Sequence, residues 1–500
     1  MPSWVKSSAA GLAGAVAALS TPAQAWRLHE PHVLGTRLDV VVAAGDESLA
    51  KRAGEAILKE IGRLDAVFNT RRPDSEISRL NVADRMAVSP EMFHVLSSAE
   101  QWRQASGGGF DGRLGRTLGL WEKAGAEAPD PAALAAARAG LADPVLDATA
   151  GTVARPAGVS FDLDAIAKGY IIDAALEAGR RAAPEITGLA VSLGGDLRCW
   201  GQAPGAEAWD VGVADPAHPF DNGPPAAIAR LSDQAIATSG RGMRDWQVAG
   251  RSLSCTVDPR TGRPVEAVVS ATAVADTAMD ADALATACMA MSPAKGLALA
   301  ERSPGTAVRI VDAGGRVHVS SGWNGLAEAQ PARLIRTQGP GALSAEQRWP
   351  ADWRLRVDYQ APDRQDVRDV SFRTPFLVVW ISDLQNKPIR TLMLIGDDPE
   401  WHKDNFVWWG SNRAQAERFV RLRSRPTARG GTYEVYWDAI DDAFQPVPVG
   451  NYILHVETSQ ERGKHTLRSL PFSIGKAAFQ KALPFTKEGG GMAVTFSLVR

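Results

Sequence analysis

The chain has 500 residues, of which 45% are hydrophobic and 22% are charged. This ordinary globular composition excludes a wholly disordered chain, and on a prior of roughly 150 residues per domain the length amounts to about three domains. With 55 Lys and Arg against 57 Asp and Glu, the chain lacks the basic excess of a general nucleic-acid binder. Its three cysteines cannot build a disulfide framework.

The first 25 residues have the three-part layout of a cleavable secretory signal. Lys6 supplies an early positive charge, a small apolar run extends from Ala9 to Leu19, and Ala23-Gln24-Ala25 ends the segment. The alternative is a short N-terminal helix. The run is shorter than the about 20 residues that span a bilayer, no later stretch reaches that length either, and no cysteine lies near the cleavage point. The sequence therefore predicts a periplasmic protein cleaved near Ala25, without a lipid anchor or a transmembrane segment.

Short β-rich runs alternate with helical stretches from Trp26 to about Arg336, which predicts an α/β domain over residues 26–336. Residues 38–43 read as a strand, and Asp46 reads as the N-cap of a helix with apolar residues at helical spacing. Ser89-Pro90 starts a second helix, which runs to the glycines at 107–109. The Ala/Pro-rich segment 125–143 is expected to be a surface insertion.

The composition changes beyond residue 337, where Gln338-Gly339-Pro340-Gly341 indicates a linker over 337–345. Residues 340–500 hold 11 of the chain's 20 Trp and Tyr residues. Alternating runs at 353–357, 375–381, 433–437 and 452–456 predict strands separated by turns. We expect residues 346–500 to form a β-sandwich.

Four local patterns carry candidate chemistry. In Phe161-Asp162-Leu163-Asp164-Ala165-Ile166-Ala167-Lys168-Gly169, a β-type run meets a helix start. Such a start favours anions and Lys168 could meet a phosphate, although an acidic N-cap before an ordinary amphipathic helix explains the pattern as well. Val191 to Asp196 is a strand ending in a glycine pair, which suits either close approach to a ligand or a plain tight turn.

The third pattern, Thr238-Ser239-Gly240 followed by 257–264, indicates by itself only a loop. The fourth is Met279 to Cys288, where Asp282 and Thr286 are four residues apart and share one helix face. A carboxylate and a hydroxyl there, supported by a backbone carbonyl, suit a hard cation such as Mg²⁺. A capping aspartate before a small-residue core helix is the alternative.

Taken in order, these patterns resemble the ApbE family of FAD:protein FMN transferases. The resemblance also rests on His32-Val33-Leu34-Gly35-Thr36, Asp74 to Asn81, Gly109-Phe110-Asp111 and Leu118 to Trp121, and covers about residues 30–325. The C-terminal third is similar to an uncharacterised domain sometimes fused to such transferases, and its end resembles immunoglobulin-like modules.

The resemblance implies a two-subdomain α/β fold that binds FAD and Mg²⁺ in a cleft. It implies cleavage of FAD and transfer of FMN to a Thr or Ser of a periplasmic or membrane-attached acceptor protein, with release of AMP. The positions that match the family's FAD contacts are Leu34, Gly109, Phe110, Asp111, Asp162, Lys168 and Val257. The metal would be held by the Ala165 carbonyl, Asp282 and Thr286, the last two acting in catalysis through the metal.

Two positions depart from the family pattern. Arg71 stands where an aromatic residue is common, and Cys255 stands where the family usually has a histidine that could accept the hydroxyl proton. We expect an active transferase in which Cys255 is not an essential base. The alternatives are an FAD pyrophosphatase that gives FMN and AMP, or a non-catalytic flavin-binding or scaffold protein.

Overall fold

The computed structural model describes residues 5–7, 25–125, 127–216, 225–241, 245–249, 251–326, 343–344, 346–350, 353–361, 376–395, 399–413, 424–425, 431–437, 439–442, 445–459, 465–486 and 490–498. Residues 25–216 and 228–326 belong to one compact unit, and those from 343 onward belong to a second. Most of the expected signal segment and linker lie outside the described residues, so both stay predictions.

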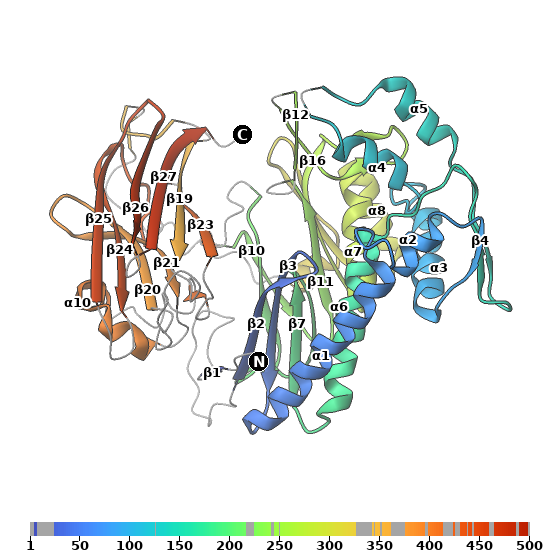
Figure 1. Cartoon of the computed structure of the whole chain (residues 1–500), viewed down its shortest axis with the longest axis horizontal. Helices are drawn as coiled ribbons and strands as arrows, with labels where there is room; N and C mark the ends of the chain where they lie inside the picture. Colours follow the sequence, from blue (N-terminus) through green and yellow to red (C-terminus); the bar gives the residue numbers. More distant parts are fainter. Residues whose placement is uncertain are drawn as a thin grey trace. The chain divides into compact units, whose positions relative to one another are not determined.

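A nine-stranded antiparallel sheet forms the base of the first unit (Figure 1). Its order is β1-β2-β3-β7-β8-β11-β16-β17-β18, with bounds Val5–Ser7, Ala25–Val33, Thr36–Ala43, Gly188–Leu193, Asp196–Gly201, Ala235–Gly240, Val268–Ala275, Ala307–Asp312 and Val317–Val319. The smaller strands are β4 Arg85–Ala87, β5 Val145–Asp147, β6 Thr152–Ala154, β9 Trp209–Val213, β10 Ala227–Leu231, β12 Trp246–Val248, β13 Arg251–Leu253, β14 Val257–Asp258 and β15 Arg263–Pro264.

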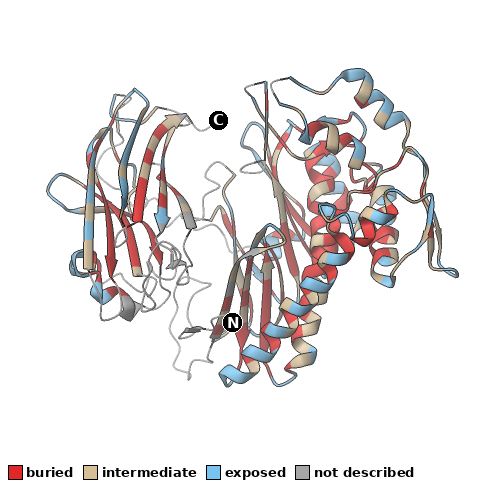
Figure 2. Ribbon diagram, in the orientation of Figure 1, coloured by how far each residue is buried: buried red, intermediate tan, exposed pale blue. Residues whose placement is uncertain are grey.

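Helices cover one face of this sheet. They are α1 Glu47–Phe68, α2 Glu76–Leu80, α3 Pro90–Ala105, α4 Gly115–Glu122, α5 Pro131–Ala139, α6 Asp164–Ala182, α7 Ala278–Met289, α8 Pro293–Arg302 and α9 Trp323–Leu326. The buried sides of α1, α6 and α7 face the strands, and the outer side of α1 is exposed (Figure 2). This arrangement confirms the expected mixed α/β architecture.

Local signals placed the first helices correctly. The Asp46 carboxylate accepts hydrogen bonds from the amides of Ser48 and Leu49 at the start of α1, and Ser89 caps α3 with Pro90 in its first turn. The expected surface insertion contains α5, whose N-cap is Asp130. These helices begin where short-range capping chemistry predicts.

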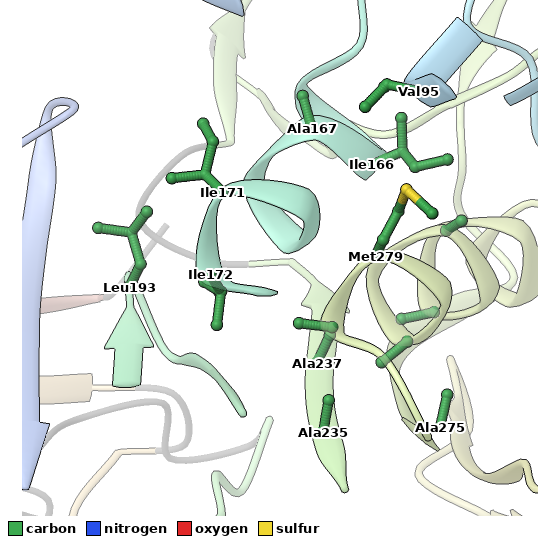
Figure 3. Packing of buried hydrophobic residues seen from close by; sticks show 14 of the residues in the cluster. Val95, Ile166, Ala167, Ile171, Ile172, Leu193, Ala235, Ala237, Ala275 and Met279 are labelled. Carbon is green, nitrogen blue, oxygen red and sulfur yellow. The ribbon is translucent and has the colours of Figure 1, made fainter. Parts of the chain in front are cut away.

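Small residues let α6 and α7 cross closely over the strands. Ile172 of α6, Ala237 of β11 and Met279 of α7 belong to one hydrophobic core (Figure 3). Asp173 ties the two helices together, because its carboxylate accepts hydrogen bonds from the Ala278 and Met279 amides at 2.8 and 3.0 Å. Burial raises the pKa of Asp173 to about 6, against the opposing effect of Arg198.

Gly169 lies at this crossing, and Gly169→Ala is expected to destabilise the protein by about 3 kcal/mol because overpacking forces backbone shifts. An added Cβ would overlap the Ala278 carbonyl and lie 2.6 Å from Met279 Cα. Urea denaturation measures the loss. Gly62→Ala is the matched control: no atom lies within 4 Å of its added Cβ, so it should stabilise α1 by about 0.5–1 kcal/mol. Equal stability of the two variants would contradict the prediction.

The second unit consists of two β-sheets. The four-stranded sheet has the order β23-β19-β27-β26, with bounds Gly431–Trp437, Trp353–Ala361, Gly490–Leu498 and Phe479–Thr486. The five-stranded sheet has the order β22-β21-β20-β24-β25, with bounds Ser424–Arg425, Pro388–Ile395, Phe376–Ser382, Gly450–Ser459 and His465–Ile474. The short helices η2 Pro399–Asp404 and α10 Phe406–Asn412 lie between β21 and β22 in the chain.

Both sheets contribute side chains to one core, which includes Val357, Trp437 and Phe496 from the first sheet and Leu454 and Phe472 from the second. All the strand pairs are antiparallel except β21 with β22. The predicted β-rich tail is therefore confirmed as a region of antiparallel sheets, whereas its immunoglobulin-like topology stays a prediction. Within the described residues, no helix has the length and apolar character that crossing a membrane requires.

Candidate functional site

The start of α6 is fixed by contacts from two distant loops. Asn81 forms paired hydrogen bonds with the backbone of Phe161, at 2.7 and 2.9 Å, and the Asp162 amide donates to the Gly112 carbonyl at 2.9 Å. The helix begins at Asp164 with Leu163 as a cap that makes no side-chain hydrogen bond. The sequence offered an acidic N-cap as an alternative, but the residue at the N-cap position is Leu163. The nearest acidic contact is the Asp162 carboxylate, which accepts a hydrogen bond from the Asp164 amide at 3.2 Å.

The Asp162 carboxylate has an unusual proton affinity. Desolvation by burial raises the pKa of Asp162 to about 7, and the nearby charges of Asp164 and Glu122 act in the same direction. Such a group holds or releases a proton near neutral pH, a property common at functional sites.

This shift predicts a pH dependence of stability. The folded-state pKa of Asp162 lies above its ordinary value of 3.8, so the folded protein holds the extra proton between about pH 4 and 7. The corresponding stability is present at low pH and is lost as the pH rises towards 7. Asp162→Asn should flatten this decline, measured by denaturation at several pH values.

Asp74→Asn is the control with the opposite sign, since the Arg72 hydrogen bond lowers the pKa of Asp74. The stability that this lowered pKa contributes is fully present above about pH 4 and is lost only at lower pH, so Asp74→Asn should show a small loss that is constant between pH 4 and 7. A decline in Asp162→Asn as steep as in the parent would contradict the prediction.

Lys168 of α6 is held by a buried carboxylate at the start of β8. Its Nζ lies 2.5 Å from Oδ2 of Asp196, whose side chain is 2% exposed. The other oxygen of Asp196 accepts a hydrogen bond from the Thr238 amide of β11 at 3.0 Å. The glycine pair before Asp196, with φ values of +63° and +100° at Gly194 and Gly195, forms a tight turn, one of the two alternatives that the sequence left open, and places the carboxylate at this position.

Asp282 lies on the side of α7 that faces α6. The residue is 3% exposed, and its Oδ2 accepts a hydrogen bond from the Gly169 amide at 3.3 Å. In a regular α-helix that amide pairs with the carbonyl four residues earlier, which is the Ala165 carbonyl. The Asp282 carboxylate therefore lies beside the turn of α6 that carries the Ala165 carbonyl. The N-cap of α7 is Thr277, whose hydroxyl donates to the Asp280 carboxylate at 2.6 Å, so the aspartate that serves the helix start is Asp280 and not Asp282.

Thr286 follows Asp282 by one helical turn and points towards β11. Its Oγ1 lies 2.9 Å from the Ser239 Oγ. Thr286 is the only residue between Ala281 and Ala290 that is not buried, because its neighbours on α7 pack into the core. Thr286 is therefore the one partly exposed residue on this stretch of α7.

The expected metal ligands offer oxygen atoms of the kind that Mg²⁺ prefers. A buried carboxylate from Asp282, the Thr286 hydroxyl and the adjacent Ala165 carbonyl form such a donor set. Among the described residues, no group of three or more His, Cys, Asp or Glu side chains could hold a metal. The residues present thus fit a hard cation that completes its coordination with water or phosphate.

The other expected FAD contacts come from three separate segments: the turn at Leu34, the loop 109–111 and strand β14 at Val257. Leu34 adopts a left-handed conformation, φ +52°, in the turn between β2 and β3, and packs partly against the core. Arg71 lies close to this turn, because its Nη1 would be 3.8 Å from a Cβ added to Gly35. A Cβ on Gly194 would lie 2.9 Å from the Thr36 Oγ1, so this turn also approaches the one before Asp196.

The side chains of Phe110 and Asp111 in the loop 109–111 are engaged within the protein. Phe110 is 2% exposed and belongs to the core, and its amide donates to the Ser106 hydroxyl at 3.0 Å, so its ring is not presented to a ligand. The Asp111 carboxylate forms a bidentate pair with Arg113 at 2.9 and 2.7 Å. A Cβ on Gly109 would lie 3.3 Å from the Ala287 carbonyl, so the loop runs directly against α7.

Val257 is 5% exposed and packs with Trp121, Leu134 and Val248 in a separate apolar cluster. The turn that follows it reaches the end of α7, because Arg260 donates to the Ala290 carbonyl. Cys255 is half-buried and forms no disulfide.

The contacts bring Lys168, Asp282 and Thr286 into one region between α6, α7 and β11, whereas Leu34 lies in the turn between β2 and β3 and Val257 lies in the apolar cluster with Trp121. Sequence reasoning did not assign roles to Asp196 and Ser239. Their signal was present in the glycine-pair strand end and in Thr238-Ser239-Gly240, but each pattern alone indicated only a turn.

Comparisons with known proteins agree with this arrangement. Residues 34–310 match the model of the ApbE family. The FAD:protein FMN transferase of Treponema pallidum is 30% identical over 306 residues, which cover 56% of this chain and 83% of the relative. The FAD:protein FMN transferase of Salmonella typhimurium is 29% identical over 314 residues, covering 58% and 86%.

Solved structures give the same result. The ApbE protein of Thermotoga maritima is 28% identical, with a TM-score of 0.56, and the alignment covers 61% of this chain and all of that protein. The flavin transferase ApbE from Vibrio cholerae is 26% identical, with a TM-score of 0.51 and coverage of 60% and 99%. Residues 356–490 match a family described as a predicted periplasmic protein, DUF2271.

Proposed function

The chain belongs to the ApbE family, and from this premise we propose that it is an exported, Mg²⁺-dependent FAD:protein FMN transferase. The reaction cleaves the FAD pyrophosphate and joins the FMN phosphate to a Thr or Ser hydroxyl of an acceptor protein, and AMP leaves. The acceptor is periplasmic or membrane-attached. Relatives that bear the name FAD:protein FMN transferase, with most of their length covered, support this assignment.

One observation carries the proposal: on α7 a buried carboxylate and the hydroxyl of a half-buried threonine lie one helical turn apart, and the neighbouring helix α6 carries the ammonium group of Lys168. Mg²⁺ held by Asp282, Thr286 and the Ala165 carbonyl would neutralise phosphate charge and orient the attacking group. Lys168 would bind the pyrophosphate as a point charge, and the loops at Leu34, 109–111 and Val257 would bind the rest of FAD.

The incoming hydroxyl must lose a proton. Cys255 would need its thiol pKa lowered from about 8.5 to accept that proton at neutral pH. We therefore propose that Cys255 is not an essential base. General-base catalysis contributes about 10²–10⁴-fold, so an enzyme without the histidine would be slower but active.

We also propose that the protein works in the periplasm after cleavage near Ala25. The match of residues 356–490 to a predicted periplasmic family supports this location. We propose further that residues 337–345 link the transferase domain to the C-terminal domain, and that the C-terminal domain is an immunoglobulin-like sandwich.

The test is to incubate the full chain with FAD, Mg²⁺ and a periplasmic extract and to examine a denaturing gel for flavin fluorescence. A fluorescent band that depends on Mg²⁺ and disappears with EDTA is expected. Release of FMN and AMP without a labelled band would identify a pyrophosphatase instead. FAD binding without cleavage would identify a flavin-binding or scaffold protein.

A further inference from the structure

Two side chains that have no role in the proposed reaction connect its lysine to its metal-binding threonine. The contacts run from Lys168 Nζ to Asp196, from Asp196 to the Thr238 amide, and from the next residue, Ser239, to the Thr286 hydroxyl. The three distances involved are 2.5, 3.0 and 2.9 Å, and Asp196 is 2% exposed.

Resting on the proposed function, we infer that Ser239 and Asp196 are positioning residues. Ser239 aims the Thr286 hydroxyl at the cation, and Asp196 holds both Lys168 and the backbone that carries Ser239. Neither residue touches the reacting atoms; each acts through a group that does.

The role of Ser239 follows from the chemistry of a hydroxyl ligand. A threonine oxygen that turns a lone pair towards a cation must donate its proton elsewhere, and the partner of that proton fixes the orientation. Inside a helix the default acceptor is the carbonyl four residues earlier, which for Thr286 is the Asp282 carbonyl. The Ser239 Oγ at 2.9 Å offers an acceptor on β11 instead.

Strand register directs Ser239 towards α7. Side chains alternate between the two faces of a strand, and Ala237 of the same strand lies in the core under the helices. Thr238 therefore points to the opposite face, where its Oγ1 lies 2.9 Å from the Thr272 Oγ1. β11 thus contributes to two hydroxyl pairs of equal length: Thr238 pairs with Thr272 within the sheet, and Ser239 pairs with Thr286 of α7.

This symmetry supplies the experiment. Calorimetric titration of Mg²⁺ into the FAD-saturated full chain should show that Ser239→Ala weakens Mg²⁺ binding by about 10-fold or more, the range typical of lost metal-ligand support. Ser239→Thr keeps the hydroxyl and should recover most of the affinity. Thr272→Val removes the equivalent hydroxyl pair on the other face and should bind Mg²⁺ within twofold of the parent.

The outcomes separate this inference from the proposed function. Ser239→Ala with parental Mg²⁺ affinity would overturn the inference alone. Equal weakening in Ser239→Ala and Thr272→Val would also overturn it, since a general loss of packing would then explain both. Absence of Mg²⁺ binding by the parent would overturn the proposed metal site together with the inference. A parent that binds Mg²⁺ but transfers no FMN would contradict the function and leave the binding comparison decisive for Ser239.

Discussion

Asp282→Asn should lower the rate of FMN transfer by about 10³-fold while the protein remains folded. Asparagine keeps the size of the side chain, and its carbonyl oxygen can still accept the Gly169 hydrogen bond, which spans 3.3 Å in the parent. What it removes is the negative charge that holds the cation. Metal stabilisation of phosphoryl transfer is worth several kcal/mol, and each 1.36 kcal/mol changes a rate about tenfold.

The same substitution should change stability in a diagnostic way. A carboxylate that is 3% exposed is costly to bury without a cation, so Asp282→Asn should melt at the same or a higher temperature than the parent in EDTA. Mg²⁺ and FAD should then raise the melting temperature of the parent more than that of the variant, because ligands stabilise only the state that binds them.

Asp280→Asn is the matched control on the same helix. Its carboxylate accepts hydrogen bonds from Thr277 and Trp102, at 2.6 and 2.9 Å, and serves the start of α7. This variant should lose stability and keep its Mg²⁺ response. Unchanged turnover of Asp282→Asn at limiting Mg²⁺ would show that the metal lies elsewhere.

Local chemistry made much of the first unit predictable. The Asp46 and Ser89 caps, the strand at 38–43 and the turn at Gly194-Gly195 depend on residues within a few positions of one another. Resemblance to the family added the expected identity of the ligands, because a series of weak motifs in a fixed order is more specific than any one of them.

Long-range geometry was not predictable from the same patterns. Asp196 follows a turn in the sequence, but its partners Lys168 and Thr238 come from elements 28 residues before and 42 residues after it. Likewise, Phe110 belongs to a ligand-binding motif, yet tertiary packing buries its ring. Alternation predicted the strands of the tail, whereas nothing local indicates that β19, at the start of that unit, pairs with the last strand, β27.

Lys168→Met should weaken FAD binding by about 10²-fold and also destabilise the protein. Among the described residues, Lys168 is the only lysine whose ammonium forms an ion pair with the buried Asp196, at 2.5 Å. Breaking a buried pair by removing one partner costs about 3–5 kcal/mol, because the other charge is left without compensation. The ammonium is 20% exposed, so the lower end of that range applies.

The double variant Lys168→Met with Asp196→Asn separates the two effects. Removing both charges eliminates the uncompensated carboxylate, and the asparagine oxygen can still accept the Thr238 amide, which donates to Asp196 at 3.0 Å in the parent. Stability, measured by urea denaturation, should therefore return towards the parental value, whereas FAD affinity, measured by fluorescence quenching, should stay weak because no cation meets the pyrophosphate. Recovery of both stability and FAD affinity would show that Lys168 serves the fold alone. If the double variant were less stable than Lys168→Met, the stability loss in Lys168→Met would not come from breaking the Lys168–Asp196 pair.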